Sequence, residues 1–299
     1  MKYGVIDIGS NTTKAFVYDS EDNYRVTDSL HRPTKLINYI SGGIMNEDGI
    51  NAAIKDIGEL KEFLIGEKCD EIFSYATSAT RDCINCGEII EKINTSCGLS
   101  VDVLSGKAEA LCDAKGATLL GMKDFLCIDL GGGSAQVCEY RGGELLTALS
   151  WPLGALRTKK VLGGTDFPDE ELEMKTVALI KGYIGDVRAS EDDLPAIIMG
   201  GASQSCKKIM GHLGVLMNQT NKEIFYFIYK RLQAKSSEDR MNLLRTYVPL
   251  RAEILGYALL ILHTIMDQLK VGKVIFTEKG SREGYLLYKL EDTDFSEIV

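Results

Sequence analysis

The chain has 299 residues and a mass of 32.9 kDa, a length that suits two domains better than one. Hydrophobic residues make up 45% and charged residues 26%, which excludes disordered, collagen-like and low-complexity proteins. With 34 basic and 43 acidic residues the formal net charge is −9, so a broad surface for duplex nucleic acid is also excluded.

No apolar run approaches the length of about 18 residues that a transmembrane helix needs, so no membrane association is expected. Asp7 interrupts any signal-peptide core, which predicts a cytoplasmic protein whose 8 cysteines are reduced thiols. Only Cys83 and Cys86 have metal-like spacing, and no second pair follows. Small buried hydrophobes are therefore a better interpretation of the cysteines than a zinc site.

The first part of the chain alternates short apolar runs with amphipathic segments. Strands are predicted at residues 3–8, 14–18, 24–30, 71–76 and 101–104, and helices at 47–65, 84–94 and 106–120. The helix at 47–65 is indicated by apolar positions at helical spacing, which are Ile50, Ile54, Ile57, Leu60 and Leu64.

The second part begins with a similar set of strands and then becomes mostly helical. Strands are predicted at 125–130, 135–140, 144–149, 196–199 and 273–277, and helices near 168–188, 202–210, 221–233 and 250–269. No Pro-rich or Ser-rich linker divides the chain, so we expect the boundary at a short crossover near 120–124. The domains are then 1–122 and 123–299, and a last helix near 281–291 would pack back on the first domain.

One internal repeat stands out. Ile6-Asp7-Ile8-Gly9-Ser10 returns as Ile128-Asp129-Leu130-Gly131-Gly132, at an offset of 128 − 6 = 122 residues. Each copy is an apolar strand, an aspartate, a glycine turn and a second strand. A duplicated hairpin of this kind predicts two similar halves that face one another.

The two turns are candidate phosphate sites, because glycine lets a ligand approach backbone N–H groups and such N–H arrays bind phosphate oxygens. The candidate residues are Ser10, Asn11 and Thr12 in the first turn and Gly131, Gly132, Gly133 and Ser134 in the second. Asp7 and Asp129 would repel phosphate, so they are candidates to hold Mg²⁺ or its water instead. The alternative is that both aspartates only cap turns.

A third turn, Met199-Gly200-Gly201-Ala202-Ser203, follows the apolar run 195–199. A strand, a Gly-Gly turn and a helix form another phosphate or nucleotide geometry, in which a helix N-terminus faces the anion. Alone this signal is weak, since Gly-Gly before a helix is common.

Two Asp-x-Gly hairpins and a Gly-Gly turn resemble the actin/Hsp70/sugar-kinase superfamily. More narrowly, the chain resembles the exopolyphosphatase and guanosine pentaphosphate phosphatase (Ppx/GppA) family along its whole length. The matching pieces are Ile6-Asp7-Ile8-Gly9-Ser10-Asn11-Thr12, Ala76-Thr77-Ser78-Ala79-Thr80-Arg81-Asp82, Leu104-Ser105-Gly106-Lys107-Ala108-Glu109-Ala110, Ile128 through Gln136, Pro152-Leu153-Gly154-Ala155-Leu156-Arg157 and Arg282-Glu283-Gly284.

The resemblance implies an α/β fold of two ribonuclease-H-like domains, with mixed sheets flanked by helices and the active site in the cleft between the domains. It also implies Mg²⁺-dependent hydrolysis of a terminal phosphoanhydride. Glu109 matches the glutamate that the family uses as general base, whereas a glutamate at a helix start could merely stabilise the helix dipole. Arg81 follows a hydroxyl-rich turn, where a guanidinium could bind phosphate in a forked manner or form a surface salt bridge.

The sequence also departs from the family pattern. The family usually has Ser-Thr-Glu after the second glycine turn, and this chain has Ser134-Ala135-Gln136. A glutamine can accept a hydrogen bond but brings no charge, so Gln136 is a weaker candidate for the metal site than a glutamate would be.

We therefore expect a phosphohydrolase that acts on inorganic polyphosphate or guanosine pentaphosphate, with Glu109 and Arg81 as catalytic residues. Two alternatives stay open at this point. One is an ATP-dependent small-molecule kinase on the same scaffold, and the other is a catalytically weak sensor of a phosphorylated nucleotide, which Gln136 favours. An exposed helical face in the second half could pair two copies as a homodimer.

Overall fold

The computed structural model describes residues 1–22, 24–215 and 220–295, and within these the chain divides into two compact units. Unit 1 contains Met1–Cys112 and the segment that begins at Ser281, and unit 2 contains Asp113–Gly280. The division falls inside helix α4 (Gly106–Thr118), upstream of the crossover expected at 120–124. The chain returns to unit 1 at helix α11 (Ser281–Leu290).

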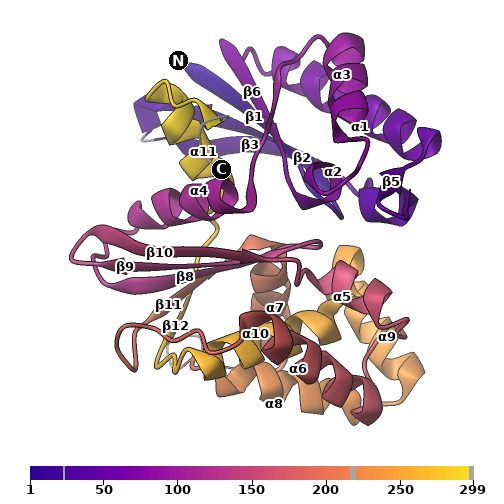
Figure 1. The fold of residues 1–299 in the computed structure, drawn as a ribbon, viewed down its shortest axis with the longest axis vertical. Helices are drawn as coiled ribbons and strands as arrows, with labels where there is room; N and C mark the ends of the chain where they lie inside the picture. Colours follow the sequence, from indigo (N-terminus) through magenta and orange to yellow (C-terminus); the bar gives the residue numbers. More distant parts are fainter. Residues whose placement is uncertain (23, 216–219, 296–299) are drawn as a thin grey trace. The chain divides into compact units, whose positions relative to one another are not determined.

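In its described residues, unit 1 is built on a five-stranded sheet with the order β3-β2-β1-β6-β7. The strands are β1 (Lys2–Ile8), β2 (Thr13–Asp19), β3 (Arg25–Arg32), β6 (Glu71–Ala76) and β7 (Val101–Val103). The first three are antiparallel neighbours, and β6 and β7 run parallel to β1. Helices α1 (Glu47–Gly66) and α3 (Cys86–Cys97) cover one face, while α4 and α11 lie against the other (Figure 1).

Helix α1 shows why these elements form where they do. The Asn46 side chain accepts the Gly49 N–H at 3.0 Å and so caps the first turn. The apolar stripe expected from the sequence is buried at Ile50, Ile57, Leu60 and Leu64. Shorter elements connect the larger ones, namely η1 (Ser20–Asp22), η2 (Leu36–Tyr39), β4 (Ile40–Ser41), β5 (Ile44–Met45) and α2 (Ser78–Arg81).

Unit 2 repeats the same sheet. Its described strands form the order β10-β9-β8-β11-β12, again five-stranded with the first three antiparallel. They are β8 (Phe125–Leu130), β9 (Ala135–Arg141), β10 (Glu144–Trp151), β11 (Ala196–Met199) and β12 (Val274–Phe276). The helices are α5 (Ala155–Val161), α6 (Glu170–Ile184), α7 (Gly200–His212), α8 (Glu223–Gln233), α9 (Ser237–Tyr247), α10 (Leu255–Gln268) and the short η4 (Pro249–Arg251).

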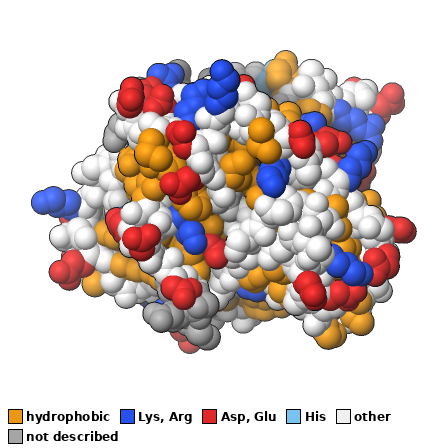
Figure 2. Space-filling view, turned by 90° about the horizontal axis from the view of Figure 1, so that it is seen from above, with side chains coloured by type: hydrophobic (Ala, Val, Ile, Leu, Met, Phe, Trp, Pro, Cys, Tyr) orange, Lys and Arg blue, Asp and Glu red, His pale blue; other side chains and the backbone are white. Residues whose placement is uncertain are grey.

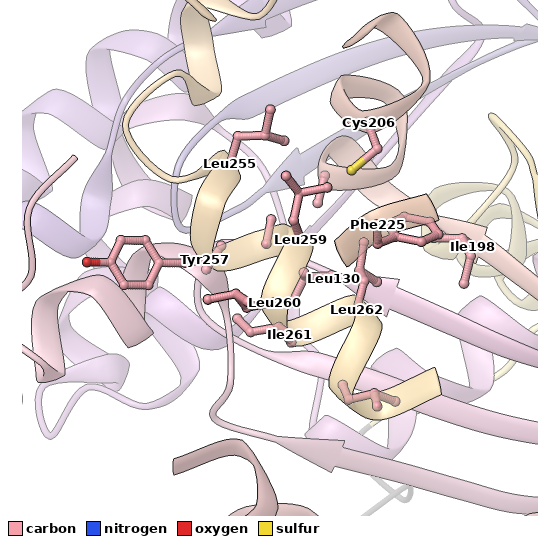
Figure 3. Packing of buried hydrophobic residues seen from close by; sticks show 14 of the residues in the cluster. Leu130, Ile198, Cys206, Phe225, Leu255, Tyr257, Leu259, Leu260, Ile261 and Leu262 are labelled. Atoms are coloured by element: carbon pink, nitrogen blue, oxygen red, sulfur yellow. The ribbon is translucent and has the colours of Figure 1, made fainter. Parts of the chain in front are cut away.

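Helix α10 is the centre of the unit 2 core. It packs against α6 and α8, and nearly all of its side chains are buried, including the consecutive run 258–262 (Figure 3). A helix that is apolar on every side belongs in the interior of a protein, which is where α10 lies. Among the described residues no helix combines the length and the apolar character that a membrane crossing needs.

Helix α9 was not expected from the sequence. It presents few apolar residues, and only Met241 and Leu244 are buried, so its periodic signal is weak. The local signal that could have identified it is Ser236, whose hydroxyl accepts the Asp239 N–H at 3.1 Å as an N-cap. Helix α5 is also absent from the predicted elements. Its first residues belong to the Gly-Ala-Leu-Arg motif, which was used as evidence for the family resemblance and not for a helix.

The predicted α/β class is confirmed, since both units are mixed sheets flanked by helices and share one strand order. Acidic and basic side chains are interspersed over the face of the molecule in Figure 2.

Candidate active site

Asp7 lies in a row of residues that crosses the unit 1 sheet just before the first glycine turn. The strand register places Asp7 opposite Tyr75 on one side and Lys14 on the other, and Lys14 opposite His31. Cross-strand partners share one face of a sheet, so these side chains are neighbours. The Lys14 ammonium lies 3.5 Å from the Asp7 carboxylate.

Unit 2 carries the equivalent row. Asp129 lies opposite Met199 and Gln136, and Gln136 lies opposite Ser150. The sequence offset is the same for both positions, because 129 − 7 = 122 and 136 − 14 = 122. The repeat therefore extends from the glycine turns into the sheets, and Gln136 occupies in unit 2 the place that Lys14 occupies in unit 1.

The first turn is held by bonds that direct its carbonyl groups toward the segment that leads into η2. The Ser10 carbonyl accepts the Ile37 N–H at 3.3 Å, and the Asn11 carbonyl accepts the Lys35 N–H at 3.0 Å. The hydroxyls of Ser10 and Ser78 are 3.0 Å apart. That contact joins the turn to the start of α2, and Ser78 was not singled out from the sequence.

The second turn has the same construction. The carbonyls of Gly131 and Gly132 accept the N–H groups of Ala155 and Leu156 at 3.1 and 3.0 Å, so they satisfy the N-terminus of α5. The Gly131 N–H donates to the Ser134 carbonyl at 3.0 Å and is thus used inside the turn. Within the described ranges the N–H groups of Gly132 and Gly133 donate to no backbone carbonyl. They are therefore available to a ligand.

Gly154 supports the second turn by a close approach of two backbones. A Cβ at this position would overlap the peptide that joins Gly132 and Gly133. We therefore expect Gly154→Ala to displace the turn, with a loss of roughly 1–3 kcal/mol in the free energy of unfolding, as overpacking typically costs. The affinity of the Gly154→Ala protein for phosphate should fall as well.

Urea unfolding and calorimetric phosphate binding would measure both effects. Gly182→Ala is the matched control, because a Cβ at Gly182 in α6 would meet no atom within 4 Å. A Gly154→Ala protein that binds phosphate as tightly as the control would remove this support from the site.

The third turn is built around Asp129. Helix α7 begins at Gly200 directly after β11, as the strand, Gly-Gly and helix pattern predicts. Gly200 has φ +79° and packs so closely on the Asp129 carboxylate that no Cβ could fit. Gly201 packs in the same way against the Arg251 guanidinium.

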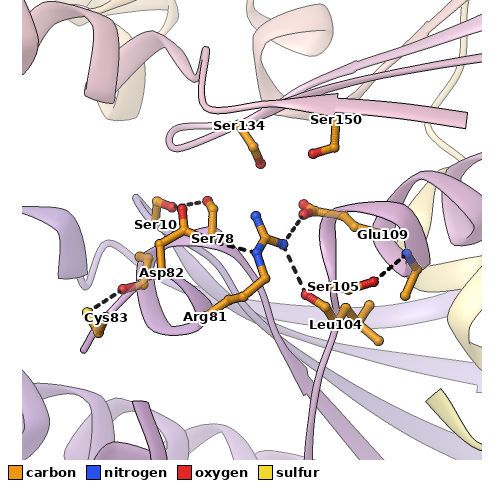
Figure 4. A network of polar contacts seen from close by, with 12 residues as sticks. Ser10, Ser78, Arg81, Asp82, Cys83, Leu104, Ser105, Glu109, Ser134 and Ser150 are labelled. Atoms are coloured by element: carbon orange, nitrogen blue, oxygen red, sulfur yellow. Dashed lines mark hydrogen bonds and ion pairs between the residues drawn. The ribbon is translucent and has the colours of Figure 1, made fainter. Parts of the chain in front are cut away.

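Arg81 and Glu109 form a buried ion pair in unit 1 (Figure 4). The Arg81 Nη1 donates to Glu109 Oε2 at 2.8 Å and to the Leu104 carbonyl at 3.0 Å. Its Nε donates to Asp82 Oδ1 at 3.0 Å. The two side chains of the pair are only 18% and 10% exposed, so it is not the surface salt bridge that was the alternative for Arg81.

The charge of Arg81 is secured by its neighbours. Burial by itself lowers the pKa of the guanidinium, but the carboxylates of Glu109 and Asp82 outweigh burial and raise that pKa. Within the described residues Nη2 bonds to no protein atom. Two N–H donors of a permanently charged group therefore remain for an anion.

Glu109 is positioned by the start of α4. The Ser105 hydroxyl accepts the Ala108 N–H at 3.0 Å, and the Ser105 carbonyl accepts the Glu109 N–H at 2.9 Å. This cap fixes the first helical turn, from which the Glu109 carboxylate reaches Arg81. The fixed position is what a general base needs, and dipole stabilisation alone would not require burial.

Gln136 lies beside the second turn and is 1% exposed. Its amide nitrogen donates to the hydroxyls of Ser134 and Ser150 at 3.0 and 3.1 Å. Ser150 was not predicted as a site residue, although it directly precedes the Trp151-Pro152-Leu153-Gly154 segment. The signal that could have found it is its place opposite Gln136 in the hairpin.

Arg282 serves the packing of unit 1. Its guanidinium lies over the Phe16 ring, 4.1 Å from the centroid, and its Nε donates to Glu283 at 2.8 Å. Glu283 in turn accepts the Tyr18 hydroxyl at 2.9 Å. The Arg-Glu-Gly motif thereby anchors α11 on the sheet. Glycine is needed at position 284 because a Cβ there would overlap the Cys112 carbonyl.

The cysteines are free thiols, and Cys83 is buried, donating to the Ala79 carbonyl at 3.1 Å. Burial raises the pKa of the Cys86 thiol, which disfavours the thiolate that a metal would need. In the part of the chain that the structure describes, no group of three or more His, Cys, Asp or Glu residues could hold a metal ion.

That finding bears on Mg²⁺ as well. Magnesium commonly binds through one or two carboxylates, several waters and substrate phosphates rather than an all-protein cage. Single aspartates near the ends of strands, beside the candidate phosphate-binding turns, fit this mode. Asp7 in unit 1 and Asp129 in unit 2 are each a candidate ligand in this mode, whereas Gln136 directs its amide nitrogen to serines.

Known proteins resemble this chain in both sequence and fold. Exopolyphosphatase 1 of Mycobacterium tuberculosis is 28% identical over 212 residues, which cover 67% of this chain and 58% of that protein. The chain thus spans little more than half the length of this curated relative. An exopolyphosphatase from Cytophaga hutchinsonii superposes with a TM-score of 0.85 at 18% identity, over 99% of each chain. The Aquifex aeolicus member of the Ppx/GppA protein family superposes with a TM-score of 0.78 at 20% identity, over 98% of each chain.

The two solved structures show that the fold is shared, since their sequence identities are too low to show more. The sequence pattern of the Ppx/GppA phosphatase family matches residues 28–293, which is most of the chain. The matched range contains Arg81, Glu109 and the second glycine turn, and the first glycine turn precedes it. The chain belongs to the Ppx/GppA phosphatase family.

Proposed function

We propose that this protein is a phosphoanhydride hydrolase that releases the terminal phosphate of inorganic polyphosphate or of guanosine pentaphosphate. The observation that carries the proposal is the buried Arg81–Glu109 pair, which joins an anion-binding donor to a carboxylate. Through Ser78 the segment that bears Arg81 is also tied to the first phosphate-binding turn.

Phosphoryl transfer needs a positioned nucleophile and positive groups on the equatorial oxygens, more than it needs covalent chemistry from the protein. In the proposed reaction the Nη2 donors of Arg81 bind oxygens of the terminal phosphate. The backbone N–H groups of Gly132 and Gly133 bind phosphate oxygens in unit 2, and the hydroxyls of Ser134, Ser10 and Thr12 line their turns.

Glu109 is proposed to accept a proton from the attacking water. The water oxygen forms a bond to the terminal phosphorus, the bridging P–O bond breaks, and the shortened chain leaves with the bridging oxygen. Glu109 bonds to Arg81 through Oε2. Arg81 consequently has two roles, because it orients the base and binds the group that is attacked.

Asp7 in unit 1 and Asp129 in unit 2 would each serve as a carboxylate ligand for Mg²⁺, which would neutralise charge on the phosphate oxygens of the substrate. Asp7 is already partly neutralised by Lys14 at 3.5 Å, so the row in unit 1 has less negative charge than a bare aspartate. In unit 2 the strand position opposite Asp129 is occupied by Gln136, whose side chain carries no charge.

Polyphosphate is the substrate favoured by the names of the relatives, which are exopolyphosphatases. A phosphate-release assay decides the matter with long polyphosphate, tripolyphosphate, guanosine pentaphosphate, ATP and a phosphomonoester, each with and without Mg²⁺. The proposal expects release from at least one phosphoanhydride with a terminal phosphate and none from the monoester. Release from the monoester alone would overturn it.

A second candidate function is sensing of a phosphorylated nucleotide without turnover. Gln136 favours it, because a neutral amide replaces a carboxylate beside Asp129 and weakens any metal site there. Tight retention of guanosine pentaphosphate without phosphate release in the same assay would select this second function.

A further inference from the structure

Gln136 fixes the hydrogen-bond direction of two serines. Its amide nitrogen donates one hydrogen to Ser134 Oγ at 3.0 Å and the other to Ser150 Oγ at 3.1 Å. Ser134 lies in the second turn directly before β9, and Ser150 lies on β10 opposite Gln136 (Figure 4). Ser134 is 3% exposed and Gln136 is 1% exposed, so water cannot freely replace these bonds.

The orientation of the amide follows from counting its partners. With nitrogen toward the serines, only the buried carbonyl oxygen Oε1 of Gln136 is left without a hydrogen bond. With oxygen toward the serines, both N–H hydrogens would be left in the buried position instead. Since each unsatisfied buried polar group costs free energy, the orientation with nitrogen toward the serines is the more stable one.

A serine hydroxyl has a single hydrogen, and an oxygen that accepts from an amide directs that hydrogen elsewhere. Within the described residues, neither Ser134 nor Ser150 donates its hydroxyl hydrogen to a protein atom. Ser134 belongs to the second turn, beside the N–H groups of Gly132 and Gly133. The two hydroxyls and these N–H groups are hydrogen-bond donors in one place, which suits an anion with several oxygens.

We infer that Gln136 is a positioning residue that turns Ser134 and Ser150 into donors for a phosphate group, and that Ser150 binds this group directly. The inference rests on the proposed function for the identity of the ligand as a phosphoanhydride or its phosphate product. It deepens that function by adding a metal-independent phosphate subsite in unit 2.

A glutamate at position 136 would act in the opposite direction. A carboxylate only accepts hydrogen bonds, so it would take the hydroxyl hydrogens of Ser134 and Ser150 for itself. The subsite would lose two donors and gain a negative charge. Gln136 thus offsets the missing metal-binding carboxylate by improving direct binding of the anion.

The test measures binding of inorganic phosphate and tripolyphosphate by calorimetry in the presence of EDTA. Because Ser150→Ala removes one hydrogen bond to a charged ligand, we expect its affinity for phosphate to fall roughly 10-fold. Gln136→Glu should lower the affinity further. Thr147→Ala is the control, because Thr147 is also on β10 but its register places it on the other face of the sheet. It should bind like the parent.

A double-mutant cycle separates hydrogen-bond direction from simple charge repulsion. In the Gln136→Glu background the Ser150 hydrogen is already taken, so adding Ser150→Ala should change affinity less than about 2-fold. If the affinity losses of Gln136→Glu and Ser150→Ala add in full in the double variant, the inference is wrong. Gln136→Met, which adds no charge and only a weakly accepting thioether, should bind more tightly than Gln136→Glu, and circular dichroism checks that each variant is folded.

Phosphate release by the same proteins with Mg²⁺ distinguishes failure of the inference from failure of the proposed function. If the parent protein releases phosphate but the affinity losses in the double-mutant cycle are additive, only the inference is overturned. Binding with a non-additive cycle and no turnover on any phosphoanhydride overturns the proposed function alone. If the parent binds no phosphate at millimolar concentration in EDTA, the metal-independent subsite is wrong whatever the turnover.

Discussion

Glu109→Gln should lower kcat by roughly 10²–10⁴, the usual contribution of a general base, while KM changes little. The amide retains a carbonyl oxygen that can accept from Arg81, so the position of the side chain is kept. It cannot accept the proton of water, which is why the loss should appear in kcat. Steady-state phosphate release from the preferred substrate measures both constants.

Glu59→Gln is the matched control. Glu59 also pairs with an arginine in unit 1, since Arg32 Nε donates to its carboxylate at 2.7 Å, but that pair is more exposed. The control should retain parental kinetics. Turnover of Glu109→Gln within a few-fold of the control would place the base elsewhere.

Arg81→Lys should lower kcat/KM by roughly 10- to 100-fold, because an ammonium cannot replace the forked donor set of a guanidinium. The arginine bonds simultaneously to Glu109, Leu104 and Asp82 and keeps Nη2 for the ligand. A lysine retains the charge beside Glu109 and thus the fold, but not the geometry. Competition binding of tripolyphosphate should show weaker affinity as well.

Arg32→Lys gives the corresponding control at the Glu59 pair, where an exposed salt bridge contributes little to stability. Equal kinetics for Arg81→Lys and Arg32→Lys would contradict the role of Arg81 as the phosphate clamp. A loss confined to kcat, with unchanged tripolyphosphate affinity, would leave Arg81 with only the task of orienting the base.

Much of the fold was predictable because its signals are local. The Asp-x-Gly motifs at Asp7 and Asp129, the stripe of α1 and the apolar runs of β1 and β8 each depend only on residues close together in the sequence. The strand order could be anticipated through the resemblance to a family. Helix α9 was missed because only Met241 and Leu244 are buried along it, which gives a weak apolar stripe.

The chemistry of the site was predictable as residue types but not as partners. The motif around Arg81 indicated a phosphate ligand, yet the bonds from Arg81 to Leu104 and Glu109 join segments that are distant in sequence. The serine pair that Gln136 organises depends on strand register, which the sequence left open. The assignments of Glu109, Arg81, Asp7 and Asp129 to roles in catalysis stay predictions until variants are measured.

The most direct test of the central claim is the fate of ¹⁸O-labelled water during turnover of tripolyphosphate, followed by mass spectrometry of the products. Attack of water on the terminal phosphorus predicts one labelled oxygen in the released orthophosphate and none in the pyrophosphate that remains. The label should enter at a rate reduced in proportion to kcat in Glu109→Gln. Label in the pyrophosphate, or phosphate release without label, would contradict the account.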